Sequence, residues 1–405
     1  MALSVIIPML VLPEGVVKKW IILGVVVVVL AGTFVGLDIK ATRVAAQMNP
    51  VLRKTPYTPT KQGAALHSEL FIADLHADPL LWNRDLNKRG TQGQVDVPRL
   101  LEGNVALQVF SVVTKTPRHM NTERNDDTTD DVQLLAIAQH WPPNTWFSLK
   151  ARALYEAKKL AKTADASDGK LVFIRTRADL ERFLAEREKD KGRVGALLSL
   201  EGMHALEGNI DAVDELYDAG FRMLGFAHFF DNEVSGSAHG VQKGGLTELG
   251  RSVVKRMEEK GITLDLAHSS PKTISEVLAM ATRPLVVSHT GVKGTCDNTR
   301  NLSDEQLRGV ARNGGVVGIG YWDTATCGKD AKAIARAIRY AVSVAGIDHV
   351  GLGSDYDGAV AAPFDTAGLV ELTDSLIAEG FSEAEIRKIA GENALRVLKG
   401  NLPAQ

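Results

Sequence analysis

The chain has 405 residues, of which 45% are hydrophobic and 24% are charged, and its formal net charge is −2 at pH 7. These are ordinary values for a globular protein, so the composition excludes an intrinsically disordered chain and allows a large buried core. Because the charge is nearly balanced and no dense stripe of Lys and Arg carries interleaved aromatics, we expect no nucleic-acid partner and favour small-molecule chemistry.

The N-terminal region contains a long apolar segment. Trp20 to Leu37 is an uncharged stretch of about 18 residues, close to the minimum for a helix that crosses a membrane. Lys18 and Lys19 precede it, which favours a membrane anchor that leaves the rest of the chain on the periplasmic or extracellular side. Two alternatives stay open: a secretory signal cleaved near Ala46, with export of the rest of the chain, or a buried core helix.

The chain after this segment divides into a linker and one large domain. We predict an N-terminal segment over residues 1–40 and an extended linker over 41–64, because Pro50, Pro56 and Pro59 disfavour regular structure there. A single catalytic domain is expected over 65–400, since barrels built from alternating strands and helices routinely take about 250 residues or more.

Eight short apolar runs in this domain predict β-strands, and helical patterns lie between them, including one long helix from Asp130 to Ala161. Parallel strands need a crossover connection, so strands that alternate with helices predict an α/β fold, a (β/α)8 TIM barrel. The predicted strands are Leu70 to Ala73, Val105 to Val113, Val194 to Leu200, Arg222 to Ala227, Ile262 to Ala267, Pro284 to Ser288, Val316 to Tyr321 and His349 to Ser354.

Two features of the connecting loops bear on function. The polar segment Lys115 to Pro143 follows the second strand, and such a loop lies over the catalytic face of a barrel, so it is either a lid or substrate wall or a surface insertion without function. The two cysteines, Cys296 and Cys327, lie in the loops after the sixth and seventh strands. They form a disulfide if the domain is exported, or stay as two buried thiols.

Polar residues of the kind that bind metals recur at the ends of the predicted strands. His76 and Asp78 follow the first strand, and because residues two apart in a strand face the same way, both side chains would enter the barrel mouth. A single His-x-Asp is a weak signal, and a lone Glu after a strand often pairs with Arg. The pattern as a whole is stronger, because six such residues end successive strands: His76, Asp78, Glu201, His268, His289 and Asp355.

The chemistry of this set points to catalytic zinc. Imidazole and carboxylate ligands without thiolate, with an open position for water, are typical of such sites. Glu201 has two carboxylate oxygens and would bridge two ions, with His76 and Asp78 on one side and His268 and His289 on the other. Asp355 is then left as a proton shuttle.

The motifs around these residues resemble those of the membrane (renal) dipeptidase family. The resemblance rests on Asp74-Leu75-His76-Ala77-Asp78, Leu200-Glu201-Gly202, Asp265-Leu266-Ala267-His268-Ser269, Ser288-His289, Thr299-Arg300-Asn301-Leu302-Ser303-Asp304 and Gly353-Ser354-Asp355-Tyr356-Asp357-Gly358. These motifs run in the family's order from about Leu70 to Leu398. The order and number of the motifs make the resemblance specific.

The resemblance implies a binuclear zinc enzyme that hydrolyses dipeptides, including those with a C-terminal D-residue. It also implies that His228 contacts the scissile carbonyl, that Arg300 holds the substrate carboxylate, and that Asp355 and Glu201 act in catalysis. Cys296 and Cys327 match positions bridged in some animal relatives. Homodimers are common in the family.

We therefore expect a membrane-anchored or exported zinc dipeptidase. A binuclear hydrolase of another small amide or lactone is the alternative on the same barrel. A surface protein that only binds its ligand is a second alternative, against which the complete set of ligands and Asp355 argue.

Overall fold

The computed structural model describes residues 18–20, 32, 36–53 and 55–404, and its centre is a closed ring of parallel strands. Each strand of the ring pairs with the next, β9 pairs with β1, and β2 pairs with β4, which closes the circle. The predicted eight-stranded (β/α)8 barrel is therefore confirmed. In ring order the strands are β1 (Ile72–Ala77), β2 (Val105–Phe110), β4 (Val194–Leu200), β5 (Phe221–Gly225), β6 (Thr263–Asp265), β7 (Val286–Thr290), β8 (Val316–Ile319) and β9 (Val350–Leu352).

A ninth strand, β3 (Leu171–Phe173), lies outside this ring and was not predicted. It pairs with the beginning of β4, where Gly195 has Leu107 of β2 as its partner on one edge and Val172 of β3 on the other. Further along β4 the same edge pairs with β5, starting at Leu198. Three residues are too short a run to give a clear strand pattern in the sequence.

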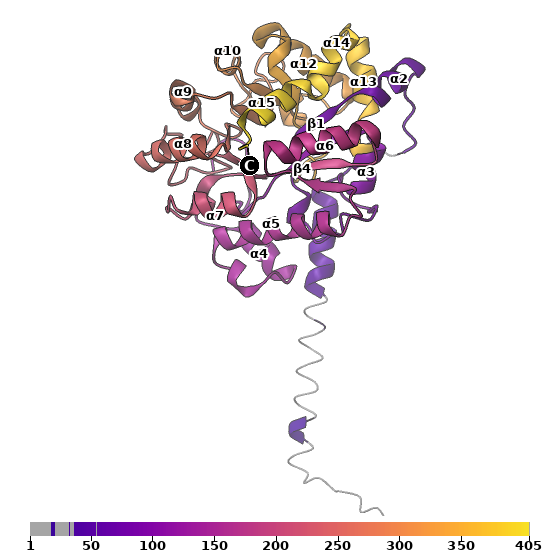
Figure 1. The fold of residues 1–405 in the computed structure, drawn as a ribbon. Helices are drawn as coiled ribbons and strands as arrows, with labels where there is room; N and C mark the ends of the chain where they lie inside the picture. Colours follow the sequence, from indigo (N-terminus) through magenta and orange to yellow (C-terminus); the bar gives the residue numbers. More distant parts are fainter. Residues whose placement is uncertain (1–17, 21–31, 33–35, 54, 405) are drawn as a thin grey trace, which may run out of the picture.

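Helices surround the ring, as Figure 1 shows. The ring strands are buried along their whole length, because side chains on one side fill the barrel and those on the other side meet the helices. The larger helices are α5 (Leu149–Asp165), α6 (Arg177–Lys189), α7 (Ala212–Asp218), α8 (Glu248–Lys260), α9 (Pro271–Met280), α10 (Asp304–Arg312), α12 (Ala331–Ala345), α13 (Val370–Ala378) and α15 (Asn393–Asn401).

The long helix predicted from Asp130 to Ala161 is wrong as a single element. It is two helices, α4 (Asp131–Ala138) and α5, and the chain between them contains Pro142 and Pro143. Proline in a helix interior removes a backbone hydrogen bond and clashes with the preceding turn, so the helix has to end before this pair.

The N-terminal part departs from the predicted extended linker. Residues 36–48 are helical, and Asn49 fixes the end of this helix, because its side-chain oxygen accepts a hydrogen bond from the Ala359 N–H at 2.8 Å. A second helix, α2 (Lys61–Glu69), begins before the predicted linker ends. Most of the predicted membrane helix, Trp20 to Leu37, lies outside the described residues, and no helix within them is long and apolar enough to cross a membrane.

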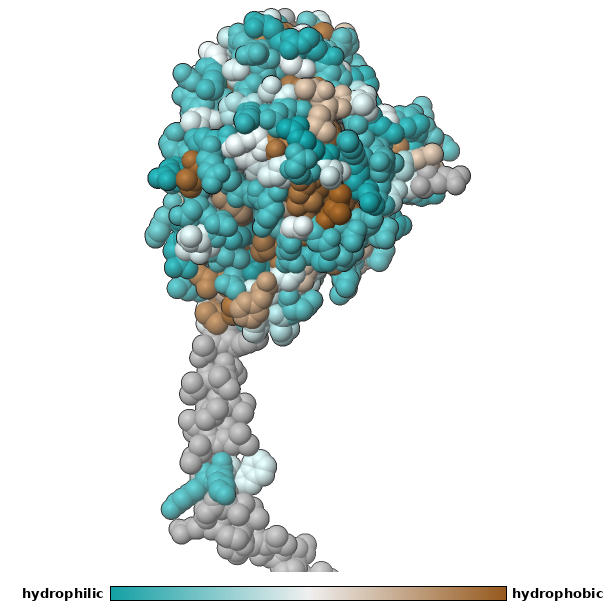
Figure 2. Space-filling model, turned by 90° about the vertical axis from the view of Figure 1, so that its left-hand side faces the viewer, coloured by the Kyte–Doolittle hydropathy of each residue, from teal (hydrophilic) through white to brown (hydrophobic). Residues whose placement is uncertain are grey.

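Cys296 and Cys327 are joined in a disulfide, with a Cα–Cα distance of 5.2 Å. The bond links the loop after β7 to the end of the short helix α11 (Asp323–Thr326), which follows β8. Figure 2 shows one face of the molecule as mostly hydrophilic, with apolar side chains gathered in small groups.

Candidate metal centre

The first two predicted ligands lie at the end of β1. His76 lies inside this strand, because β1 extends to Ala77 and is longer than predicted, and Asp78 is the first residue after it. Their side chains face the same way, with His76 Nε2 3.2 Å from Asp78 Oδ2. Both side chains are only 1% exposed. The inference from strand alternation therefore holds, although the predicted strand ended too early.

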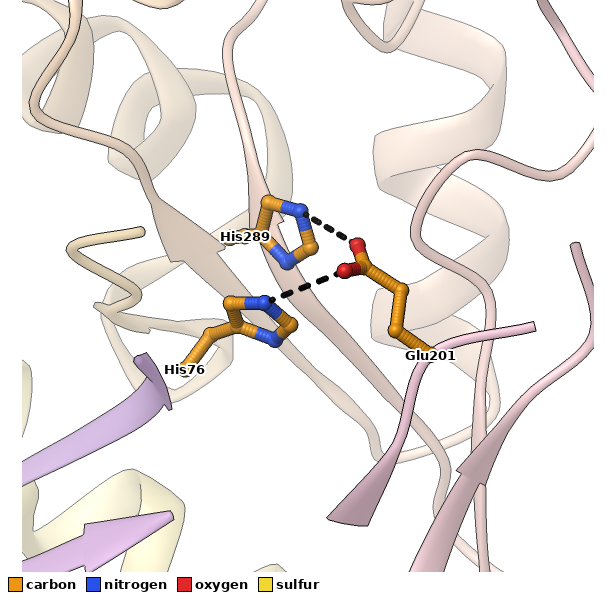
Figure 3. Close-up of side chains that lie close together, drawn as sticks. All are labelled: His76, Glu201 and His289. Carbon is orange, nitrogen blue, oxygen red and sulfur yellow. Dashed lines mark ion pairs between the residues drawn. The ribbon is translucent and has the colours of Figure 1, made fainter. Parts of the chain in front are cut away.

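Glu201 comes directly after β4 and is the point at which the imidazoles converge. His268 Nε2 lies 2.9 Å and His289 Nε2 3.3 Å from its Oε1. His76 Nε2 lies 3.7 Å from its Oε2 (Figure 3), and His228 Nε2 lies 3.5 Å from the same oxygen. One buried carboxylate thus faces imidazoles that come from β1, β7 and the loops after β5 and β6.

Two of the site residues have an unusual backbone. His268 and Asp355 each lie three residues after a strand, and each has φ of 60°. Residues other than glycine rarely adopt this left-handed conformation, and such positions concentrate at functional sites. Asp355 is brought within 3.8 Å of His76 Nε2 through its Oδ1.

Two carboxylates to which the sequence interpretation gave no role hold the strand ends in place. Asp74 accepts hydrogen bonds from the Ser354 N–H at 2.8 Å and the Ser354 hydroxyl at 2.5 Å, which ties β1 to the loop after β9. Asp265 accepts from the Ser288 N–H at 2.9 Å and joins β6 to β7. The signal was present in the sequence, since each Asp closely precedes a predicted histidine ligand.

Burial and neighbouring charges shift the pKa values of the site in opposite directions. Burial would raise the pKa of Glu201, but the imidazoles of His228, His76 and His268 hold it well below its usual range. Burial raises the pKa of Asp355 well above the ordinary value, and Asp78 and Glu201 act in the same direction. The two carboxylates are thus set apart, because the pKa of Glu201 is lowered and that of Asp355 is raised.

The donor atoms fit a metal site. Asp78 Oδ1 is buried and has no hydrogen-bond partner among the described residues, which is costly unless a cation compensates it. His268 Nε2 and His289 Nε2 lie 3.0 Å apart with the Glu201 carboxylate beside them. Nitrogen and oxygen donors without sulfur suit zinc and related divalent metals.

The grouping of these donors differs in part from the predicted one. Three sets of donor atoms lie close enough to share an ion. The predicted ligands are all included, but Asp355 and His228, which were assigned to proton transfer and substrate, belong to these sets as well. The sets are His76, Glu201 and His289; Glu201, His228 and His268; and His76, Asp78 and Asp355.

Arg300 lies at the rim of the same site. It is buried, its guanidinium Nη2 donates to the His289 carbonyl at 2.6 Å, and the group lies 5.6 Å from the ring centre of Trp322. Burial lowers its pKa to about 10, so it stays cationic at neutral pH. It lines the cavity described next, as do His228 and Asp355.

The site opens into a cavity of about 970 Å³. The segment Lys115 to Pro143 lines it from Thr116 to Thr122 and again along α4, which supports its interpretation as a substrate wall. His239 also lines the cavity, although the sequence suggested no role for it; its ring stacks on Phe229 at 4.6 Å. No sequence motif marks His239, because it reaches the site through a long loop after β5.

A family model described as membrane dipeptidase (peptidase family M19) matches residues 60–402. The chain belongs to this family. It is 26% identical over 362 residues to an uncharacterized dipeptidase of Schizosaccharomyces pombe, with 85% of this chain and 84% of the relative covered. It is 27% identical over 354 residues to the dipeptidase aclJ of Aspergillus oryzae, with 81% and 77% covered.

Solved structures of family members resemble this barrel. The dipeptidase AC, a metallopeptidase of family M19, superimposes with a TM-score of 0.68 at 25% identity, covering 82% of this chain and 99% of its own. A metallopeptidase from Rhodobacter sphaeroides, solved with a phosphinate mimic of the dipeptide L-Ala-D-Ala, gives 0.67 at 25% identity with the same coverage. The chain is accordingly a metallodipeptidase of the M19 family, and its clustered His, Glu and Asp side chains could hold a metal ion.

Proposed function

We propose that this membrane dipeptidase family member binds two zinc ions, bridged by Glu201, and hydrolyses the peptide bond of dipeptides. The observation that carries the proposal is the convergence of His76, His268 and His289 on the two oxygens of one buried carboxylate. In this assignment His76 and Asp78 hold one ion, and His268 and His289 hold the other. Bound zinc supplies Lewis-acid activation of water and of the scissile carbonyl.

The remaining side chains would perform the proton transfers and bind the substrate. The Asp355 carboxylate takes the proton from the attacking water and passes it to the departing amine, and its raised pKa suits both steps. His228 Nε2 contacts the scissile carbonyl oxygen. The Arg300 guanidinium, which lines the cavity, binds the free carboxylate of the dipeptide, because its planar fork matches two carboxylate oxygens.

We further propose that dipeptides with a C-terminal D-residue are substrates. The support is the Rhodobacter sphaeroides relative, whose structure contains a phosphinate mimic of L-Ala-D-Ala.

We also propose that the catalytic domain is on the periplasmic or extracellular side, anchored by the apolar N-terminal segment or exported after its cleavage. The Cys296–Cys327 disulfide supports this, since such bonds persist in oxidising compartments. The family's tendency to dimerise favours a homodimer, which light scattering would test.

Arg300→Leu tests the proposed substrate class. Kinetics are measured on an L-L dipeptide, an L-D dipeptide, the matching dipeptide amide and a tripeptide, each with zinc-loaded and chelator-treated enzyme. The wild type should cleave the dipeptides well and the amide poorly, and Arg300→Leu should lose this preference, mainly through a KM for the dipeptides that rises roughly a hundredfold.

Arg300→Lys is the matched control, because lysine keeps the positive charge but lacks the planar guanidinium fork. Its KM for the dipeptides should lie between those of the wild type and Arg300→Leu. Comparable cleavage of the tripeptide, or an unchanged KM in Arg300→Leu, would contradict the carboxylate contact. Such a result would favour a hydrolase of another small amide or lactone. Metal analysis that finds no zinc after mild purification would contradict the binuclear site.

A further inference from the structure

The helix formed by residues 36–48 lines the active-site cavity although it precedes the residues that match the family, which begin at residue 60. The helix is held against the barrel at several points. Asn83 donates a hydrogen bond to Asp38 at 3.2 Å, and Asn49 holds its end through the Ala359 N–H. Ala45 packs against the buried apolar cluster that contains Leu81 and Trp82. This element therefore lies outside the residues matched by the family model and reaches the active-site mouth.

One face of this helix is turned to the cavity. Leu37, Ala41, Val44 and Met48 all line the cavity, and their spacing of three to four residues places them on a single stripe. The opposite face carries Thr42, which is exposed and does not line it. The cavity-facing stripe is apolar, with Lys40 beside it at the exposed edge.

Helix α4 and the loop after β1 complete an apolar wall with this stripe. Leu134, Leu135 and Val132 of α4 line the same cavity, as do Leu81 and Trp82. Leu134 is 50% and Met48 is 41% exposed, so apolar surface remains uncovered at the entrance. Figure 2 likewise shows apolar side chains gathered at the lower edge of the body.

The wall lies across the barrel mouth from Arg300. Arg300 follows β7, whereas the segment containing α4 follows β2, and three strands separate β2 from β7 in either direction around the ring. A dipeptide whose carboxylate contacts Arg300 and whose peptide bond lies at Glu201 therefore directs its first residue toward the apolar wall.

We propose that the helix of residues 36–48 and α4 form a specificity pocket for the first residue of the substrate, and that the preferred dipeptides have a large apolar side chain there. This proposal rests on the proposed dipeptidase function. Burial of a leucine-sized side chain against such a wall favours it over glycine by roughly tenfold or more in kcat/KM.

The test compares Leu-Ala with Gly-Ala as substrates of the full-length enzyme and two double variants. Val44→Gln with Met48→Gln makes the stripe polar, and Thr42→Gln with Arg43→Gln places the same residues on the outer face. We expect the Leu-Ala over Gly-Ala preference in kcat/KM to fall about tenfold in the first variant. The second variant should keep the preference of the wild type.

Each other outcome has a defined meaning. Equal losses on both dipeptides in the stripe variant, or the same change in both double variants, would overturn the pocket. A wild type that cleaves neither dipeptide would overturn the proposed function instead. In that case the affinity for 1-anilinonaphthalene-8-sulfonate, followed by fluorescence, decides about the pocket: weaker binding only in the stripe variant supports it, and unchanged binding refutes it.

Discussion

The buried histidine His67 should make the stability of the fold depend on pH. His67 lies in α2, where its Nε2 is 3.1 Å from the Gly103 carbonyl and its Nδ1 is 2.8 Å from the Thr373 hydroxyl. A carbonyl can only accept, so Nε2 carries the proton and Nδ1 accepts from Thr373. The neutral ring is thus fully paired, and a second proton would have to displace the Thr373 hydroxyl.

The direction and size of the effect follow from the pKa. Burial lowers the pKa of His67 to about 4, from 6.5 in the unfolded chain. The unfolded state therefore binds the proton more tightly, and the free energy of unfolding falls as the pH falls below 6.5. At 1.36 kcal/mol per pKa unit, the loss is about 2 kcal/mol at pH 5 and approaches about 3.4 kcal/mol below pH 4. Above pH 7 the group contributes no pH dependence.

Urea unfolding at pH 7.5 and pH 5.0 measures this loss in the free energy of unfolding, with His67→Gln as the comparison. Glutamine does not titrate but can still donate and accept a hydrogen bond, so the variant removes the proton uptake specifically. Other titrating groups, including the metal ligands, act equally in both proteins and cancel in the difference. The wild type should lose about 2 kcal/mol more than the variant between the two pH values. Equal losses would refute the assignment of a neutral buried ring.

Three further predictions concern the disulfide, the barrel and the site. Replacing Cys296 and Cys327 by serine together opens a loop with a sequence separation of 31 residues and should lower the free energy of unfolding by about 3.5 kcal/mol, measured against wild type with and without reductant. Gly353→Ala places a Cβ against the Ser288 carbonyl in β7, which should lower the free energy of unfolding by about 1–3 kcal/mol and reduce activity. A melting temperature equal to that of the wild type would contradict this contact. Asp355→Asn should lower kcat roughly a hundredfold or more while zinc content stays at the wild-type level, and loss of zinc instead would make it a ligand.

Features that depend on local periodicity could be predicted from the sequence. Continuous apolar runs with helical patterns between them identified all eight strands of the ring. Strand alternation placed His76 and Asp78 side by side before any contact was known. A Ser followed three residues later by Gln is likewise a local start signal for a helix, and at the start of α10 the Ser303 hydroxyl accepts from the Gln306 N–H at 3.3 Å. Each of these depends on residues only a few positions apart.

Other features had no local signal. The strand β3 is three residues long, and α6 is itself a polar segment in which few apolar residues mark a helical face. The helix of residues 36–48 overlaps a sequence that read as membrane segment and linker. Its position is set by contacts with Trp82 and Ala359, which lie 34 or more positions further along the chain. Packing between segments far apart in the sequence determines where these elements form, and patterns within a single sequence do not reveal such packing.

The arrangement of the metal-binding side chains shows the same limit most clearly. The sequence predicted that His76, Asp78, Glu201, His268, His289 and Asp355 lie together, because each lies at or near the carboxyl end of a strand, and the structure brings these side chains into contact. The sequence could not say which donors share an ion, since His76 and Asp355 are 279 positions apart and become neighbours only when β9 pairs with β1. That closure brings the Asp355 carboxylate to the Asp78 side of the site, which is where the proposed mechanism needs a group that transfers protons. Changes that weaken the β1–β9 pairing should therefore reduce activity even when every ligand is retained.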